Sequence, residues 1–228
     1  MTDIVHAPRL IVFDVNETLS DMTPVGDRFA ALGLPEHLAA PWFAGALRDG
    51  LALTVTGENP AFADLARASF HTLVHGRPDA PDDVDAAASE IISTFMDLSL
   101  HPDVAPGLRA LADLGIRLAT LSNGSAAVAQ GLVERSGLEG VFEHLLSVAD
   151  APLWKPDARA YAYALGTCDV EAEEAMLVAV HPWDIHGAAA AGLRTAYLAR
   201  SGTPYPPTMR PPELTVASVT ELAELLGA

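Results

Sequence analysis

The chain has 228 residues, half of them hydrophobic, which is enough for one large domain or for a core domain with an insertion. Its 30 acidic residues outnumber 13 lysines and arginines and give a formal charge of −17, which argues against nucleic acid and anionic membranes as partners. The single cysteine, Cys168, excludes an internal disulfide, and no segment is apolar enough to span a membrane. We therefore expect a cytoplasmic protein, in which any anionic substrate needs local positive charge.

A short apolar run near the N-terminus leads directly into an acidic residue. Residues 10–13, LIVF, have the composition of a buried strand, and Asp14 follows them at once. The carboxyl ends of parallel strands in an α/β sheet open into the ligand crevice, so we expect this acid to be a working group. The alternative is that Asp14 only caps the turn that follows.

Residues 21–100 differ from the rest of the chain. Apolar residues recur there at helical spacing between Gly, Pro and Asn breaks, and no convincing strand pattern is found. A helical block inserted directly after the first strand is expected to cover the crevice. We assign residues 21–100 to a helical cap, and residues 1–20 and 101–228 to the core.

From residue 101 onward, strand patterns alternate with helical patterns. Buried strands are predicted at residues 116–121 and 175–180, and shorter ones within residues 142–148 and 195–199. This alternation predicts an α/β fold in which helices cover both faces of a parallel sheet.

Polar side chains follow four of these segments, at the strand ends or in the turns after them. The four sets are Asp14 with Thr18, Ser122 with Asn123, Lys155 alone, and His181 with Asp184. Together they supply a carboxylate nucleophile, a neighbouring cation, donors for an anion and a second acid or base. The alternatives are a surface lysine at position 155 and simple helix capping by the Ser122 pair.

Four segments in this order resemble the motifs of the haloacid dehalogenase superfamily. They are DVNET (14–18), LSNGS (121–125), KPDARAY (155–161) and VHPWDIHGAAAAG (180–192). The resemblance covers essentially the whole chain, and LSNGS and KPDARAY are similar to the type II L-2-haloacid dehalogenase branch. It implies a Rossmann-like three-layer core with an inserted helical cap, and it suggests a homodimer.

The resemblance also implies a role for each matching residue. In that branch the residue matching Asp14 attacks C2 of the substrate and expels halide, and water hydrolyses the resulting ester to a 2-hydroxy acid of inverted configuration. The remaining matches are Ser122 for the substrate carboxylate, Asn123 for the halide side, Thr18 and Lys155 beside the nucleophile, Tyr161 as companion of Lys155, and Asp184 to orient Lys155 and the water.

Two departures argue against a magnesium-dependent phosphatase of the same superfamily. Such enzymes usually carry an acid two residues after the nucleophile, where this chain has Asn16, and an amide cannot donate and recover a proton near neutral pH. They also bind Mg²⁺ through an aspartate four residues before Asp184, where this chain has Val180, which cannot ligate a hard cation. A halide leaving group needs neither acid nor metal, so we expect no cofactor.

Other departures concern the dehalogenase branch itself. Phe43 stands where its cap arginine would fall, and Arg48 is the nearby substitute. His181 replaces an amide and is interpreted as a general base for water, with a structural histidine as the alternative. Glu17 stands where the family generally has glycine.

The sequence thus predicts a metal-independent hydrolase that displaces halide from a short 2-haloalkanoic acid through an aspartyl ester. Its catalytic residues are expected to be Asp14, Lys155, His181 and Asp184. A phosphatase or phosphonatase-like hydrolase, or a relative that binds a small acid or a partner without turnover, are the alternatives.

Overall fold

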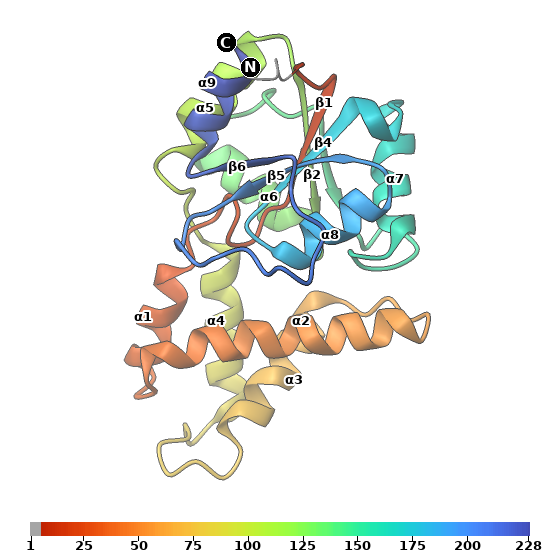
Figure 1. The fold of residues 1–228 in the computed structure, drawn as a ribbon. Helices are drawn as coiled ribbons and strands as arrows, with labels where there is room; N and C mark the ends of the chain where they lie inside the picture. The colour runs from red at the N-terminus through yellow and green to blue at the C-terminus, as the bar shows by residue number, and fades with distance from the viewer. Residues whose placement is uncertain (1–5) are drawn as a thin grey trace.

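The computed structural model describes residues 6–228, so the first five residues of the expected core segment 1–20 lie outside it. A parallel six-stranded sheet forms the centre of the core, in the order β3-β2-β1-β4-β5-β6 (Figure 1). The strands are β1 (Leu10–Phe13), β2 (Arg117–Ser122), β3 (His144–Ser147), β4 (Ala175–Ala179), β5 (Arg194–Leu198) and β6 (Leu214–Val216). All four residues of β1 are buried, as expected for a strand that is covered on both faces.

Helices cover both faces of the sheet, which confirms the predicted three-layer α/β fold. The core helices are α5 (Val104–Asp113), α6 (Ala126–Arg135), α7 (Ala158–Cys168), α8 (Pro182–Ala190) and α9 (Val219–Leu226), with a 3-10 turn, η2 (Ala172–Glu174). Successive residues of a strand point to opposite faces. Ile11 and Phe13 accordingly pack with α5 and α9, whereas Leu10 and Val12 pack with α7 and α8.

The block between β1 and α5 is helical and lies beyond one end of the sheet, away from the chain termini (Figure 1). Its elements are α1 (Thr23–Ala31), η1 (Glu36–Leu38), α2 (Ala39–Val55), α3 (Phe62–Val74) and α4 (Val84–Met96). Aromatic rings form its interior. Trp42 lies at the centre, with its ring centroid 6.1 Å from that of Phe29 and 6.2 Å from that of Phe95.

The two connections between cap and core meet at one point. Ser20 and Leu100 form an isolated antiparallel bridge, flanked by hydrogen bonds from Asp21 N–H to Ser99 O (2.8 Å) and from His101 N–H to Leu19 O (2.9 Å). We propose this bridge as the boundary between the cap, residues 21–100, and the core.

Strand ends differ by one residue from those predicted. The strand expected at residues 116–121 spans Arg117–Ser122, so Ser122 belongs to β2 itself and not to the turn. The strand expected at 175–180 ends at Ala179. Within residues 6–228, every helix is too short or too polar to cross a membrane.

Helices α5 and α9 pack closely at Gly107, where there is no room for a larger side chain. A Cβ atom on Gly107 would lie 2.7 Å from the backbone carbon of Val219, which cannot rotate away. We expect Gly107→Ala to lower the free energy of unfolding by about 1–3 kcal/mol, measured by urea denaturation.

Gly166→Ala on α7 is the matched control. A Cβ there meets nothing within 4 Å, so the same substitution should raise the free energy of unfolding by about 0.5–1 kcal/mol. Equal effects of the two changes would contradict the predicted clash.

Candidate active site

The carboxyl ends of β1, β2 and β4 bring the expected site residues together. Asp14 directly follows β1, and its N–H donates to the carbonyl of Val178 on β4 (3.0 Å). Ser122 ends β2, and His181 precedes α8 after β4. Parallel pairing aligns these ends, so residues more than a hundred positions apart in sequence share one edge of the sheet.

A fully buried ammonium lies between two carboxylates. Lys155 Nζ donates to Asp14 Oδ1 (2.9 Å) and to Asp184 Oδ2 (2.7 Å), and its side chain is 0% exposed. The hydroxyl of Tyr161, on α7, donates to the other oxygen of Asp184 (2.7 Å). The structure therefore brings Asp14, Lys155, Tyr161 and Asp184 into one continuous chain of charge-assisted hydrogen bonds.

The charges in this chain set the protonation states. Burial by itself would raise the pKa of Asp14, but the charges of Lys155 and His181 and the hydrogen bonds from Lys155 and Thr18 outweigh it, and the pKa lies below its usual value. Burial and the neighbouring charge of Asp14 hold the pKa of Asp184 above its usual value. Burial favours the neutral amine, yet the two carboxylates hold the pKa of Lys155 above its usual range. Asp14 is therefore the ionised member that remains available for chemistry.

Thr18 connects the nucleophile loop to the end of β4. Its hydroxyl donates to Asp14 Oδ2 (2.7 Å) and accepts a hydrogen bond from the backbone N–H of Val180 (3.1 Å). The carbonyl of Thr18 accepts from Nε (3.1 Å) and Nη2 (3.0 Å) of Arg200, which also binds Asp103. Arg200 was missed by the sequence analysis because it follows β5 without a recognisable motif, and only the fold brings it to Thr18.

Asn123 is a positioning residue for Lys155 in this geometry. Its amide nitrogen donates to the Lys155 carbonyl (3.0 Å), and its amide oxygen accepts from the Lys155 N–H (2.9 Å). Ser122 is buried beside it and accepts the N–H of Gly124 (2.9 Å). A Cβ on Gly124 would lie 3.3 Å from both Ser122 Oγ and Asn16 Nδ2, so the loops after β1 and β2 meet here.

His181 directs one ring nitrogen at the nucleophile. Its Nε2 lies 3.2 Å from the carbonyl oxygen of Asn16, 3.6 Å from Asp14 Oδ2 and 3.7 Å from Glu17 Oε2. A carbonyl oxygen can only accept, so Nε2 carries a proton. The N–H donates to the Asn16 carbonyl, and Asp14 Oδ2 lies just beyond hydrogen-bond range. A role of His181 as general base stays a prediction. The imidazole also stacks on Trp183, with ring centroids 5.1 Å apart.

The two cap residues predicted for the site lie in different places. Phe43 is buried, and its ring centroid is 6.4 Å from that of His181, so α2 reaches the site through this residue. Arg48 is 70% exposed, and its Nε donates to Asp49 (2.7 Å). The structure does not bring Arg48 to the other site residues, because its position on α2 directs it to solvent.

Trp154 is a further contact between core and cap that the sequence analysis did not identify. Its ring lies 6.3 Å from that of Phe62 on α3, its indole N–H donates to Pro60 O (3.0 Å), and it fills the space that a Cβ on Gly50 would need. A cavity of about 250 Å³ lies beside it, lined by residues of both parts that include Phe62, Phe95, Asn123 and Trp154. The position of Trp154 directly before Lys155 could have indicated from the sequence that it lies near the site.

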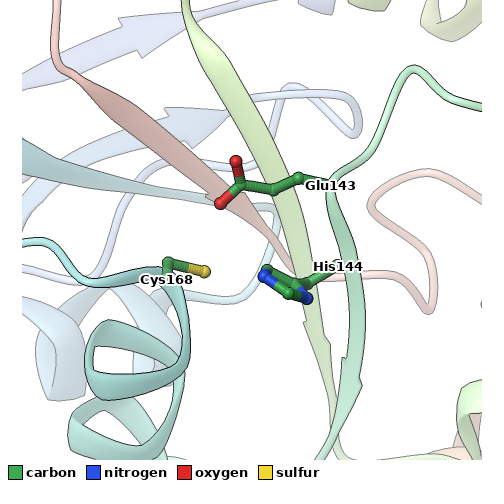
Figure 2. A group of neighbouring side chains, drawn as sticks. All are labelled: Glu143, His144 and Cys168. Carbon is green, nitrogen blue, oxygen red and sulfur yellow. The ribbon is translucent and has the colours of Figure 1, made fainter.

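One group of three potential metal ligands occurs among residues 6–228: Glu143, His144 and Cys168 (Figure 2). It lies at the amino end of β3, at the opposite end of the strands from Asp14. Arg117 already binds both oxygens of Glu143 (2.8 Å each), and burial raises the pKa of the Cys168 thiol to about 11. A paired carboxylate and a protonated thiol make this a structural contact and a poor metal site.

Removal of the buried ammonium should destabilise the fold. Lys155→Met leaves two buried carboxylates without a counter-charge, and we expect the free energy of unfolding at pH 7 to fall by about 3–5 kcal/mol. In this variant burial raises the carboxylate pKa values, so the folded state binds more protons than the unfolded state and stability falls as pH rises. Urea denaturation at pH 5 and pH 7 should show the smaller loss at pH 5.

Asp14→Asn in the Lys155→Met background is the control for that measurement. It removes one of the two unpaired charges and should recover part of the lost stability. A Lys155→Met variant as stable as the parent at pH 7 would contradict the role of the ion pair.

Comparison with known proteins matches the chain to a protein family. A family model described as haloacid dehalogenase-like hydrolase matches residues 8–192. Haloacetate dehalogenase H-2 of Moraxella sp. (strain B) is 30% identical over 220 residues, which are 95% of this chain and 97% of that protein. (S)-2-haloacid dehalogenase 1 of Pseudomonas sp. (strain CBS-3) is 29% identical over 96% of each chain.

Solved structures agree with this match. A crystal structure of a dehalogenase with an intermediate complex superimposes with a TM-score of 0.89 and 28% identity, and covers 98% of this chain and 99% of that one. A family model that spans most of the chain, a relative of nearly equal length and a shared fold all lead to one assignment. The chain belongs to the haloacid dehalogenase-like hydrolase family.

Proposed function

We propose that this chain is a dehalogenase that hydrolyses a short 2-haloalkanoic acid through a covalent ester on Asp14. The observation that carries the proposal is the ionised Asp14, held at the crevice by the buried Lys155 ammonium at 2.9 Å. The relatives of similar length are named for haloacetate and for (S)-2-haloacids, and both are small acids with halogen on C2.

The first step forms one bond and breaks one. An oxygen of Asp14 attacks C2 of the substrate from the side opposite the halogen, and the carbon–halogen bond breaks with its electron pair leaving on halide. Halide is a weak base, so the step needs no general acid. This agrees with Asn16 at the position where the related phosphatases carry a second acid, and with Val180 where they hold a metal ligand.

The second step returns the carboxylate. Water attacks Cγ of the Asp14 ester, and the bond from Cγ to the ester oxygen breaks. One proton of the water passes to that oxygen, which leaves as the hydroxyl of a 2-hydroxy acid, and the second proton is released to solvent. C2 is substituted once only, so its configuration is inverted. Lys155 Nζ and Thr18 Oγ1 lie within 2.9 Å of the Asp14 oxygens and would stabilise the negative charge that develops on them.

The substrate is itself an anion on a strongly acidic protein. We propose that its carboxylate binds beside Ser122 at the amino end of α6, where Ser125 caps the helix and the positive end of the helix dipole favours negative charge. The cavity of about 250 Å³ beside Phe62 and Trp154 has apolar walls that suit a short alkyl chain. A cytoplasmic location and a homodimer are parts of the same proposal, and both rest on the sequence and its resemblance.

Isotope labelling tests the covalent step. In a single turnover in ¹⁸O-water, solvent oxygen should enter the Asp14 carboxylate and should be absent from the first product formed, because the ester is cleaved on its acyl side. Mass spectrometry of the peptide that contains Asp14 measures this directly. Asp14→Asn should lose turnover and keep its folded circular dichroism spectrum, because an amide is a poor nucleophile toward carbon. Label in the first product with none in Asp14 would exclude this residue as the nucleophile.

Chelation separates dehalogenation from phosphoryl chemistry. Halide and phosphate release should be measured on small panels of 2-haloacids and phosphate esters, with EDTA and with added Mg²⁺. We expect halide release that is unchanged by EDTA, because Val180 cannot ligate a cation. Phosphate release that EDTA abolishes and Mg²⁺ restores would replace the proposal with a phosphatase, and binding without any release would indicate the non-catalytic alternative.

A further inference from the structure

Glu17 has a backbone conformation that favours glycine. Its φ is +62°, in the left-handed region, where a side chain with a Cβ is strained. It is one of two non-glycine residues with positive φ in residues 6–228; the other, Asp169, ends helix α7. Strain of this kind persists where the surroundings require the side chain, and it clusters at functional sites.

The surroundings of Glu17 direct its carboxylate to His181. The Glu17 N–H donates to Ser20 Oγ (3.3 Å), and the Glu17 carbonyl accepts from His101 Nε2 (3.2 Å), so the backbone is fixed on both sides. Glu17 Oε2 then lies 3.7 Å from His181 Nε2. The Glu17 side chain remains 40% exposed and lines two cavities of about 420 Å³ at the junction of cap and core.

Three oxygens surround the same ring nitrogen. They are the Asn16 carbonyl oxygen, Asp14 Oδ2 and Glu17 Oε2, at 3.2, 3.6 and 3.7 Å from His181 Nε2. Three acceptors around one nitrogen favour the form of the ring that carries hydrogen there. Trp183 and Phe43 pack against the imidazole and limit its rotation. The ring N–H thus lies among three oxygens of the loop that carries the nucleophile.

We propose that Glu17 is a positioning residue that, together with the Asn16 carbonyl, holds His181 with its proton on Nε2, so that this N–H lies beside Asp14. The catalytic role of this N–H rests on the proposed dehalogenase function. The position of the proton on Nε2 does not depend on that function. As a donor, His181 would stabilise negative charge on Asp14 Oδ2 while water attacks the ester. The Glu17 carboxylate attracts the ring N–H of His181 most strongly when it is ionised. Burial raises the pKa of Glu17, so this attraction weakens at a higher pH than it would for an exposed glutamate.

The ring nitrogen of His181 that carries hydrogen can be identified by NMR without any substrate. Long-range ¹H–¹⁵N correlation spectra identify which imidazole nitrogen carries hydrogen, and His181→Asn assigns the signal. We expect Nε2–H in the parent, and a second population with hydrogen on Nδ1 in Glu17→Gln. Glu36→Gln is the matched control, because Glu36 lines the same second cavity and the change removes the same charge away from His181. The parent spectrum should persist in this control.

Stability and kinetics complete the test. Glu17→Gly relieves the strained φ and should raise the urea midpoint, yet Glu17→Gly and Glu17→Gln should lower kcat about tenfold through the ester-hydrolysis step with little change in KM. The Asp14 ester should then accumulate in intact mass spectra after a burst of halide, and Glu17→Asp should recover part of the rate.

Two results would overturn this inference. One is a His181 ring that carries hydrogen on Nδ1 and none on Nε2 in the parent protein, and the other is a Glu17→Gln variant whose spectrum and ester-hydrolysis rate both match the parent. Absence of halide release by the parent would instead refute the proposed function, and the spectra would still decide the role of Glu17.

Discussion

The site depends on one buried ammonium held between two buried carboxylates. Asp14 and Lys155 come from two separate loops, and Asp184 comes from the first turn of α8. Each of the three charges would be unfavourable at that depth without a partner, because desolvation of an unpaired ion costs several kcal/mol. The pairing therefore couples the loops after β1 and β3 to the first turn of α8. Asn123 holds the Lys155 backbone, Tyr161 holds Asp184 and Thr18 holds Asp14, so the geometry is supported from β2, α7 and β4.

Electrostatics also give the two carboxylates of the site different properties. Two acids share one cation, and the shared ammonium lowers the pKa of Asp14 while Asp184 is left with a raised pKa. The two carboxylates thereby have different properties in one site: one is an ionised nucleophile, and the other orients the lysine. The donor group of His181 adds a further N–H on the side of Asp14 that Lys155 does not reach.

The cap closes this site with apolar surface. Phe43 lies against His181, and Phe62 packs against Trp154, so the aromatic interior of the helical block continues down to the polar groups of the core. An apolar, water-poor cover strengthens each charge interaction beneath it. The same packing removes Arg48 from consideration as a substrate contact, because α2 can turn only one face toward the core, and Phe43 is on that face.

The sequence by itself determined the fold class and most of the site. Largely apolar strands, helical spacing in the cap and polar residues at strand ends are local patterns, and parallel pairing brings such ends together. Tertiary structure alone decided what each side chain contacts. Asn123 binds the Lys155 backbone, Arg200 binds the Thr18 carbonyl, and His181 donates to the Asn16 carbonyl beside Asp14. These contacts join residues 32 to 182 positions apart, and their direction depends on rotamers and loop conformations that no sequence pattern encodes.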